Sequence, residues 1–230
     1  MLNSNSKAGA DADSELLPID TTSALHCSKH VVSCSCGQKK YNVVYADPPW
    51  DYDSKRIGRK NGSAAYLKYK TLSLSDLKEM PVNEITDKDA VCFMWATVPL
   101  MPEAIELLKA WGFSYKTMIT WEKTGVLGMG HWFRIQTEHL LVGIKGKPKP
   151  FRHQEKNIYK HIICDHSAKP HFFRELVMKL ADKSFTDCNR LEMFARSREG
   201  MFSDYEYEGW DVFGNQVNNS IELNAGNNYS

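Results

Sequence analysis

The residues best suited to chemistry are Asp47, Pro48, Pro49 and Trp50, which directly follow the apolar run 41–46. Each proline fixes φ and removes a backbone donor, so the chain cannot continue through them as a helix or a central strand. The stiff turn presents a carboxylate, a carbonyl and an indole. It could hold an exocyclic aromatic amine, whose lone pair is delocalised into its ring, because Asp47 would accept one N–H and the Pro48 carbonyl the other.

Trp50 and an electrophilic donor complete this hypothesis. The indole offers a flat surface on which a flipped nucleobase can stack. With the amine held and its lone pair localised, a sulfonium placed in line could donate a methyl group without a metal ion or a covalent enzyme intermediate. The alternative is structural, since Asp-Pro turns are common and Trp50 could simply cap the core.

Short apolar runs alternate with helical patterns along the chain. The strand candidates are nearly continuous apolar runs, typical of a sheet covered on both faces, and they span residues 41–46, 90–97, 115–121, 138–145, 160–164 and 190–195. Helices are predicted over 101–111 and 170–182, and a weaker one over 73–80. This alternation predicts an α/β fold with one doubly wound, mostly parallel sheet and helices on both faces. In such sheets ligands bind at the carboxyl ends of strands, which is where Asp47 falls.

The length of 230 residues suits one well-cored α/β domain. Segments 1–20 and 217–230 are rich in Asn, Ser, Gly and Asp and are predicted to be mobile tails, which leaves a single domain over 21–216. No stretch approaches the roughly 18 apolar residues of a membrane span. The N-terminus also lacks a signal-peptide pattern, so we expect a cytoplasmic protein, or a nuclear one if its source is eukaryotic, with no membrane partner.

Two loop-like segments, 55–70 and 145–160, concentrate Lys and Arg in a chain whose formal net charge is only +1. Both contain aromatic residues, and either could follow a phosphate backbone, with Lys147 and Lys149 as contacts. The alternative is a solvated surface loop.

Five potential metal ligands lie close together near the N-terminus: His26, Cys27, His30, Cys34 and Cys36. His and Cys bind zinc, but there is no CxxC pair, and Cys34 and Cys36 are too close for the usual zinc spacing. We therefore expect ordinary strand and turn here, and no metal site, although the residue types leave zinc open.

Beyond the tetrapeptide, the chain resembles the adenine-amine methyltransferases related to the catalytic subunit of the eukaryotic messenger-RNA adenosine methyltransferase. The resemblance extends from about residue 41 to 217, in the blocks ADPPW (46–50), FMWAT (93–97), AWGF (110–113), WEKTG (121–125), GHWFR (130–134), EHLLVGIKG (138–146), HSAKP (166–170), LEMFAR (191–196) and GWDVFGNQ (209–216). It implies a Rossmann-like fold with a permuted motif order, in which the catalytic turn precedes the cofactor strand. It also implies S-adenosyl-L-methionine as the cofactor and nucleic acid as the partner.

The same resemblance implies roles for the cofactor residues. Glu192 would bond the ribose hydroxyls of S-adenosylmethionine, and Arg196 would lie beside that sugar. Asn215 and Gln216 would contact the adenine end. Lys123 would meet the methionine carboxylate, and Asp47 would lie near the donor's amino group. Taken alone, Lys123 could be a surface lysine and 215–216 a simple turn.

For the acceptor base, Tyr69 matches a tyrosine that lines the family's acceptor pocket. The segment 122–135 would close over the base, with His131 and Trp132 as its exposed candidates. A buried, satisfied His131 is the alternative.

The chain departs from the messenger-RNA enzymes in two places. Arg198 and Glu199 stand where those enzymes have a His-Asn pair, which puts a ribose or carboxylate contact there in doubt. An acidic and aromatic insertion, 201–208, precedes the GWDVFGNQ block, and the sequence alone suggests no function for it.

These observations predict an S-adenosylmethionine-dependent methyltransferase acting on the 6-amino group of adenine. DNA is the expected polymer, because the C-terminal part looks more like that of bacterial and phage members, which are thought to modify DNA. RNA is the nearest alternative. A cytosine amine is less favoured, because those enzymes more often have Ser in place of Asp47. A non-catalytic subunit that only presents nucleic acid is disfavoured by the intact tetrapeptide, while a homodimer or a heterodimer with a related subunit stays open.

Overall fold

The computed structural model describes residues 39–51, 71–125, 128, 132–151, 155–163, 168–196 and 207–223. The chain divides into two units, Met1–Gly37 and Gln38–Ser230, and every described residue belongs to the second unit. The predicted tail 1–20 and the Cys- and His-containing segment 26–36 lie outside the described residues. None of the described helices is long and apolar enough to cross a membrane.

The described strands form one seven-stranded sheet in the order β5-β3-β4-β2-β1-β6-β7. The strands are β1 (Tyr41–Ala46), β2 (Thr86–Thr97), β3 (Ser114–Thr124), β4 (Thr137–Lys145), β5 (Ile158–Ile162), β6 (Arg190–Met193) and β7 (Asp211–Phe213). Neighbouring strands pair in parallel everywhere except on the two sides of β4, which is antiparallel to both β2 and β3. The sheet is therefore mostly parallel with one reversed strand.

The central strand β1 is buried on both faces, which explains its nearly continuous apolar sequence. Val43 and Tyr45 pack in one hydrophobic cluster, and Val44 and Ala46 pack in the other on the opposite face. β1 pairs with β2 on one side and with β6 on the other. The residue after β1 consequently lies in the middle of the sheet edge.

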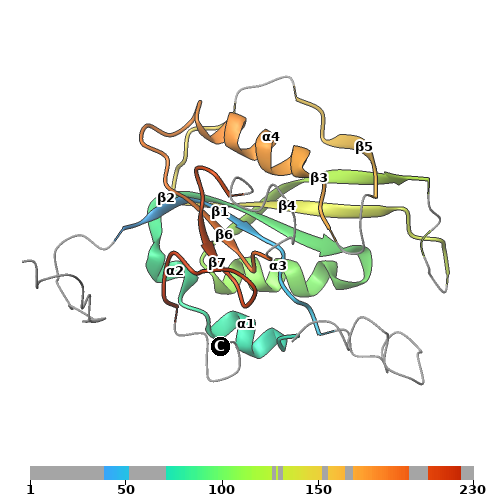
Figure 1. Ribbon diagram of the computed structural model, residues 1–230, viewed down its shortest axis with the longest axis horizontal. Helices are drawn as coiled ribbons and strands as arrows, with labels where there is room; N and C mark the ends of the chain where they lie inside the picture. The colour runs from blue at the N-terminus through green and yellow to red at the C-terminus, as the bar shows by residue number, and fades with distance from the viewer. Residues whose placement is uncertain are drawn as a thin grey trace, which may run out of the picture. The chain divides into compact units, whose positions relative to one another are not determined.

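Three helices and a short 3-10 turn cover one face of the sheet, below it in Figure 1. They are α1 (Leu74–Glu79), α2 (Val82–Ile85), η1 (Val98–Leu100) and α3 (Met101–Ala110). Ser73 caps α1 in a reciprocal capping box with Asp76. The indole of Trp111, just after α3, donates a hydrogen bond of 2.8 Å to the Leu77 carbonyl of α1, which ties these two helices together.

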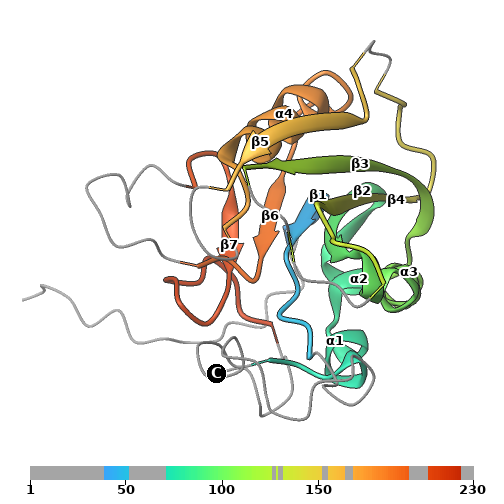
Figure 2. The same cartoon turned by 90° about the vertical axis from the view of Figure 1, so that its right-hand side faces the viewer.

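Of the described helices, α4 (His171–Ala181) covers the opposite face, as the perpendicular view in Figure 2 also shows. Phe173, Leu176, Val177 and Leu180 recur at helical spacing and are buried against the sheet. The Phe173 ring packs edge-on against Trp95 of β2, with ring centroids 5.0 Å apart. Helices therefore lie on both faces of the sheet, as the sequence predicts.

The predicted elements agree with the structure in type, and their ends differ by a few residues. β2 begins at Thr86 rather than at residue 90, because its first four residues, TDKD, are polar and give no apolar signal. β7 was not predicted, since three residues at the edge of the sheet are too few for a pattern. The predicted α/β Rossmann-like fold is confirmed.

Candidate active site

The candidate site lies at the carboxyl end of β1. The connection that leaves β1 and the connection that enters the adjacent strand β6 run on opposite faces of the sheet. The chain leaves β1 towards α1 and α2 below the sheet, whereas it enters β6 from α4 above it (Figure 1). Such a change of side is a topological switch point, and ligands of α/β sheets bind outside the strand ends at this point. Asp47 follows β1 directly and is therefore in the position expected for a functional residue.

The Pro-Pro turn fixes the backbone around Asp47. The backbone N–H of Trp50 donates to the Pro48 carbonyl at 2.8 Å, and the backbone N–H of Leu72 donates to the Pro49 carbonyl at 2.9 Å. A carbonyl oxygen has two lone pairs, so Pro48 keeps the capacity to accept one further hydrogen bond. The carbonyl that the sequence hypothesis assigns to an amine is thus both fixed in place and able to accept.

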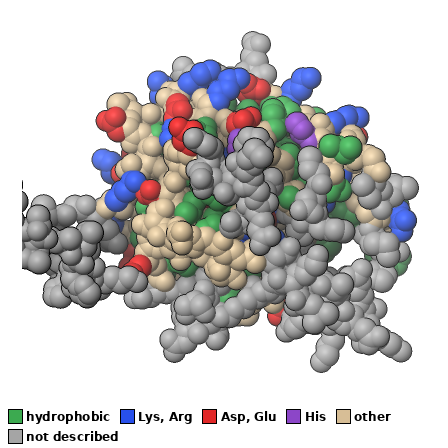
Figure 3. All heavy atoms as spheres, in the orientation of Figure 1, with side chains coloured by type: hydrophobic (Ala, Val, Ile, Leu, Met, Phe, Trp, Pro, Cys, Tyr) green, Lys and Arg blue, Asp and Glu red, His purple; other side chains and the backbone are tan. Residues whose placement is uncertain are grey.

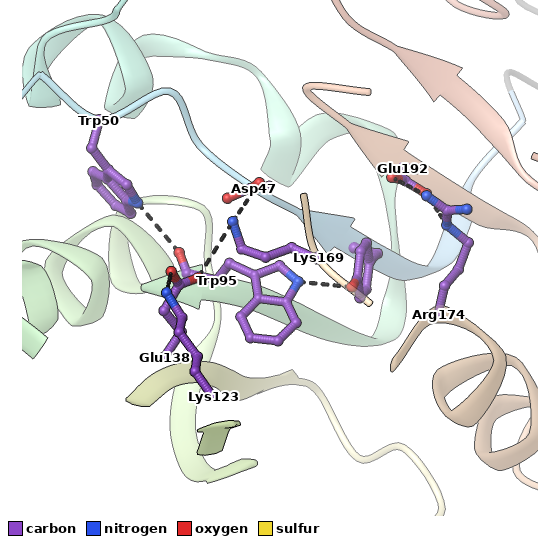
Figure 4. Close-up of polar contacts among 9 residues, drawn as sticks. Asp47, Trp50, Trp95, Lys123, Glu138, Lys169, Arg174 and Glu192 are labelled. Carbon is purple, nitrogen blue, oxygen red and sulfur yellow. Dashed lines mark hydrogen bonds and ion pairs between the residues drawn. The ribbon is translucent and has the colours of Figure 1, made fainter. Parts of the chain in front are cut away.

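Asp47 is part of a row of alternating charges at this edge of the sheet (Figure 4). Lys169 Nζ lies 2.8 Å from Asp47 Oδ2 and 3.5 Å from Glu138 Oε2. Glu138 is paired through its other oxygen with Lys123. The side chains of Lys169 and Glu138 are only 15% and 14% exposed. The row thus connects the turn after β1, the start of β4 and the residue before the Pro170 cap of α4.

The electrostatics of this row are balanced by its alternation. Burial alone would raise the pKa of Glu138, but Lys169 and Lys123 outweigh burial, so its pKa is lowered from the ordinary 4.5. Burial would lower the pKa of Lys169, but Asp47 and Glu138 raise it above the ordinary 10.5. Lys169 and Glu138 are therefore both ionised at neutral pH.

Trp50 is packed in the core more than the sequence hypothesis supposes. It is 8% exposed and belongs to the hydrophobic cluster on the α3 side of the sheet. Its indole N–H donates to the Trp95 carbonyl at 3.3 Å, which orients the ring beside Asp47's strand end. Core packing accounts for most of the indole surface, and base stacking on it stays a prediction.

The predicted cofactor residues of the C-terminal half meet on β6 and just beyond it. Glu192 lies in β6 opposite Tyr45 of β1, and Arg196 pairs with Gln216 in a parallel bridge. Gly214 permits this pairing, since a Cβ there would lie 2.1 Å from the Ala195 carbonyl oxygen. Asn215 and Gln216 are exposed beside Arg196. The structure therefore brings these four residues together on the β6 side of the switch point.

Other predicted residues are not brought to Asp47. Lys147 and Lys149 follow β4, which runs away from the site. Its site end, Glu138, and its last residue, Lys145, are separated by roughly 24 Å at about 3.4 Å per residue. Both lysines are exposed at the opposite edge of the sheet. Lys and Arg side chains also lie along the upper border of the face in Figure 3, where α4 and β5 lie, and acidic side chains are mixed among them.

The acceptor-side predictions are only partly described. Trp132 is 94% exposed, six residues before Glu138. Tyr69 and His131 lie outside the described residues, so their predicted contacts with the base stay predictions. Among the side chains that the structure describes, no group of three or more His, Cys, Asp or Glu is arranged for a metal ion.

Sequence reasoning missed Lys169, which pairs with Asp47, and Glu138, which pairs with Lys169. Both stand inside motif blocks, HSAKP and EHLLVGIKG, that carry the family resemblance. A usable signal existed for Lys169, because it follows a strand and immediately precedes the proline that caps α4. Residues between a strand end and a helix start fall at the ligand-binding edge of an α/β sheet.

The donor set fits an amino acid joined to a nucleoside. Lys169 and Asp47 can meet a carboxylate and an ammonium group, and Glu192 can accept from a pair of hydroxyls. Asn215 and Gln216 provide amide groups at the far side. The mixed sheet and the switch point are those of a Rossmann-like fold, and this donor set is consistent with a methyltransferase of that fold.

Comparisons with known proteins agree with this class. The sequence profile of the MT-A70 family matches residues 41–216, and the chain belongs to that family. Members of this family are methyltransferases that use S-adenosylmethionine as methyl donor.

Individual relatives fall into two groups. The chain is 36% identical to the type II methyltransferase M.MunI of Mycoplasma sp. over 205 residues, which cover 81% of this chain and 82% of the relative. It is 28% identical to an N(6)-adenosine-methyltransferase MT-A70-like protein of Arabidopsis thaliana, and 27% identical to the human N(6)-adenosine-methyltransferase catalytic subunit METTL3. The matches cover 81% and 77% of this chain, but only 25% and 28% of those two relatives.

Proposed function

We propose that this chain transfers a methyl group from S-adenosylmethionine to the 6-amino group of adenine in DNA. The observation that carries the proposal is the position of Asp47, on a rigid turn at the switch point, with Lys169 bound to one of its two carboxylate oxygens. The other oxygen is the candidate acceptor for the amine.

The chain's own residues would hold the cofactor from three sides. Glu192 would accept from the ribose hydroxyls with Arg196 beside them, and Asn215 and Gln216 would meet the adenine. Lys169 is better placed than Lys123 for the methionine carboxylate, because Lys169 contacts Asp47 directly while Lys123 reaches it only through Glu138. When bound, S-adenosylmethionine supplies an electrophilic methyl group on a sulfonium.

On the acceptor side, Asp47 and Pro48 would act on the amine. Asp47 Oδ1 accepts one N–H and the free lone pair of the Pro48 carbonyl accepts the other, which orients the nitrogen and localises its lone pair. Asp47 would also accept the proton that the amine loses when its nitrogen bonds to the methyl carbon. Trp132, exposed at the start of the segment leading to β4, would contact the base.

DNA is favoured because the bacterial type II methyltransferase matches over most of its own length, with the higher identity. RNA adenosine is the second candidate, supported by the N(6)-adenosine relatives, although the chain spans only about a quarter of their length. A cytoplasmic location, and a homodimer or a heterodimer with a related subunit, are further predictions.

Offering the purified chain and labelled S-adenosylmethionine to DNA and RNA oligonucleotides of matched sequence tests this function. We expect label in adenine-containing DNA and none in oligonucleotides without adenine. Label confined to RNA would favour the second candidate. Absence of label from both polymers, together with absence of cofactor binding, would contradict the proposal.

A further inference from the structure

Tyr207 belongs to the insertion 201–208, for which the sequence suggests no function, and its side chain lies against the backbone of Arg196. The Tyr207 hydroxyl donates to the Arg196 carbonyl at 2.6 Å and accepts from the Arg196 N–H at 3.1 Å. Both backbone groups of one predicted cofactor residue are thus held by a single side chain. Because Arg196 also pairs with Gln216, Tyr207 fixes the backbone between these two residues.

Arg174, on the first turn of α4, connects this tyrosine to Glu192. Its guanidinium carbon lies 4.7 Å from the centre of the Tyr207 ring, in a cation–π contact. Its Nε lies 2.5 Å from Glu192 Oε2, and its Nη2 donates to Glu192 Oε1 at 2.9 Å. The two side chains are 12% and 10% exposed, and Figure 4 shows them pointing at each other from α4 and β6.

This two-point contact of the Arg174 guanidinium with the Glu192 carboxylate, the Arg174–Glu192 fork, leaves Glu192 able to bind a ligand. Arg174 Nη2 donates a hydrogen bond to Oε1 and Nε lies against Oε2, and because each carboxylate oxygen can accept more than one hydrogen bond, Glu192 can also accept from ribose hydroxyls. The fork also sets the plane of the carboxylate, because both of its oxygens are engaged at once. Burial would lower the pKa of Arg174, but Glu192 raises it, so the guanidinium stays charged at every pH of interest.

We propose that Arg174 and Tyr207 are positioning residues that orient Glu192 and Arg196 for the ribose of the cofactor. The inference rests on the proposed function, since it takes Glu192 and Arg196 as ribose residues. Arg174 orients the carboxylate, Tyr207 fixes the Arg196 backbone, and the cation–π contact makes the two act as one unit. Neither residue needs to touch the ligand.

The test is calorimetric binding of two ligands, S-adenosylhomocysteine and its 2′,3′-dideoxy analogue, which lacks both ribose hydroxyls. Arg174→Lys keeps the charge but cannot reproduce the fork. We expect it to weaken binding of S-adenosylhomocysteine by about tenfold while changing the affinity for the dideoxy analogue by less than about twofold. Tyr207→Phe keeps the ring but loses the clamp on Arg196, and should act in the same direction by about threefold.

Tyr159→Phe is the matched control, because it removes the hydroxyl of a β5 tyrosine that bonds Glu155, and β5 lies at the other edge of the sheet from β6. We expect this variant to bind both ligands as the wild type does, and thermal unfolding of all variants should show that each is folded. If a variant loses affinity equally for both ligands, or if both variants bind S-adenosylhomocysteine as the wild type does, the inference is wrong but the proposed function stands. If the wild-type chain binds the two ligands equally, the assumed ribose contact is wrong. If it binds neither ligand, the proposed function is wrong, and in both cases the inference fails with it.

Discussion

Lys169 Nζ lies 2.8 Å from Asp47 Oδ2, although 122 residues separate them in the chain. The pair joins the turn after β1 to the residue before the cap of α4, and Glu138 at the start of β4 completes it from the other side. A cation held between two carboxylates keeps one oxygen of Asp47 occupied and orients the other. The pair is therefore central to what this site can bind.

Replacing Lys169 with Met should weaken binding of S-adenosylmethionine by at least about tenfold, because the carboxylate of the cofactor loses its cation. The free energy of unfolding should fall by about 1–3 kcal/mol, since Asp47 and Glu138 lose a partner in a largely buried site. Calorimetry and chemical denaturation measure the two effects. Lys179→Met, which breaks an exposed pair with Glu155, is the control and should change neither quantity appreciably.

Replacing Asp47 with Ala should reduce methyl transfer by at least about a thousandfold, because the amine loses the acceptor that orients it. Cofactor affinity should change much less, since Lys169 and Glu192 remain. Single-turnover assays at saturating cofactor, together with calorimetry, separate these quantities. Normal turnover at saturation combined with a large loss of cofactor affinity would show that Asp47 acts on the cofactor and not on the acceptor.

Glu138 should make stability depend on acid pH. Because its pKa in the folded chain is below the ordinary 4.5, its contribution to stability is complete above that pH and is lost as the pH falls through the lower folded value. Glu138→Gln should therefore be less stable than wild type at neutral pH, and the difference should shrink in acid. Urea denaturation across this range measures it, and a difference that stays constant with pH would contradict the charged pairing.

Reversing the charges of Lys147 and Lys149 to Glu should weaken nucleic-acid binding and lower the slope of log K against log salt by about two. Turnover at saturating nucleic acid should be unchanged, because these lysines lie at the edge of the sheet opposite Asp47. Fluorescence anisotropy at several salt concentrations gives the slope. A salt dependence identical to wild type would remove this loop from the binding surface.

The sequence predicts the stiff Pro-Pro turn and the sheet well because both leave local signals. β1 is a continuous apolar run that ends in two prolines, and the α3 and α4 helices repeat their apolar residues at helical spacing. The direction of β4 leaves no such signal, because a buried strand has the same composition whichever way it runs. That direction decides that Glu138 lies beside Lys169 and that Lys147 and Lys149 lie far from it.

Contacts between segments far apart in the chain could not be predicted from the sequence either. Lys169 was visible as part of a motif block, but its pairing with Asp47 depends on the path of the chain through β5 and into α4. Tyr207 belongs to an insertion with no family pattern to compare, and only the fold shows that it meets Arg174 and Arg196. Residue types could be chosen from sequence, whereas their partners required the structure.

The most direct test of the central claim identifies the methylated nucleoside. The chain is incubated with S-adenosylmethionine carrying a deuterated methyl group and with adenine-containing DNA, and the DNA is then digested to nucleosides for mass spectrometry. We predict the label in N6-methyldeoxyadenosine, and its loss with Asp47→Ala. Label in a methylated cytosine, or an Asp47→Ala variant that methylates adenine as fast as wild type, would contradict the account.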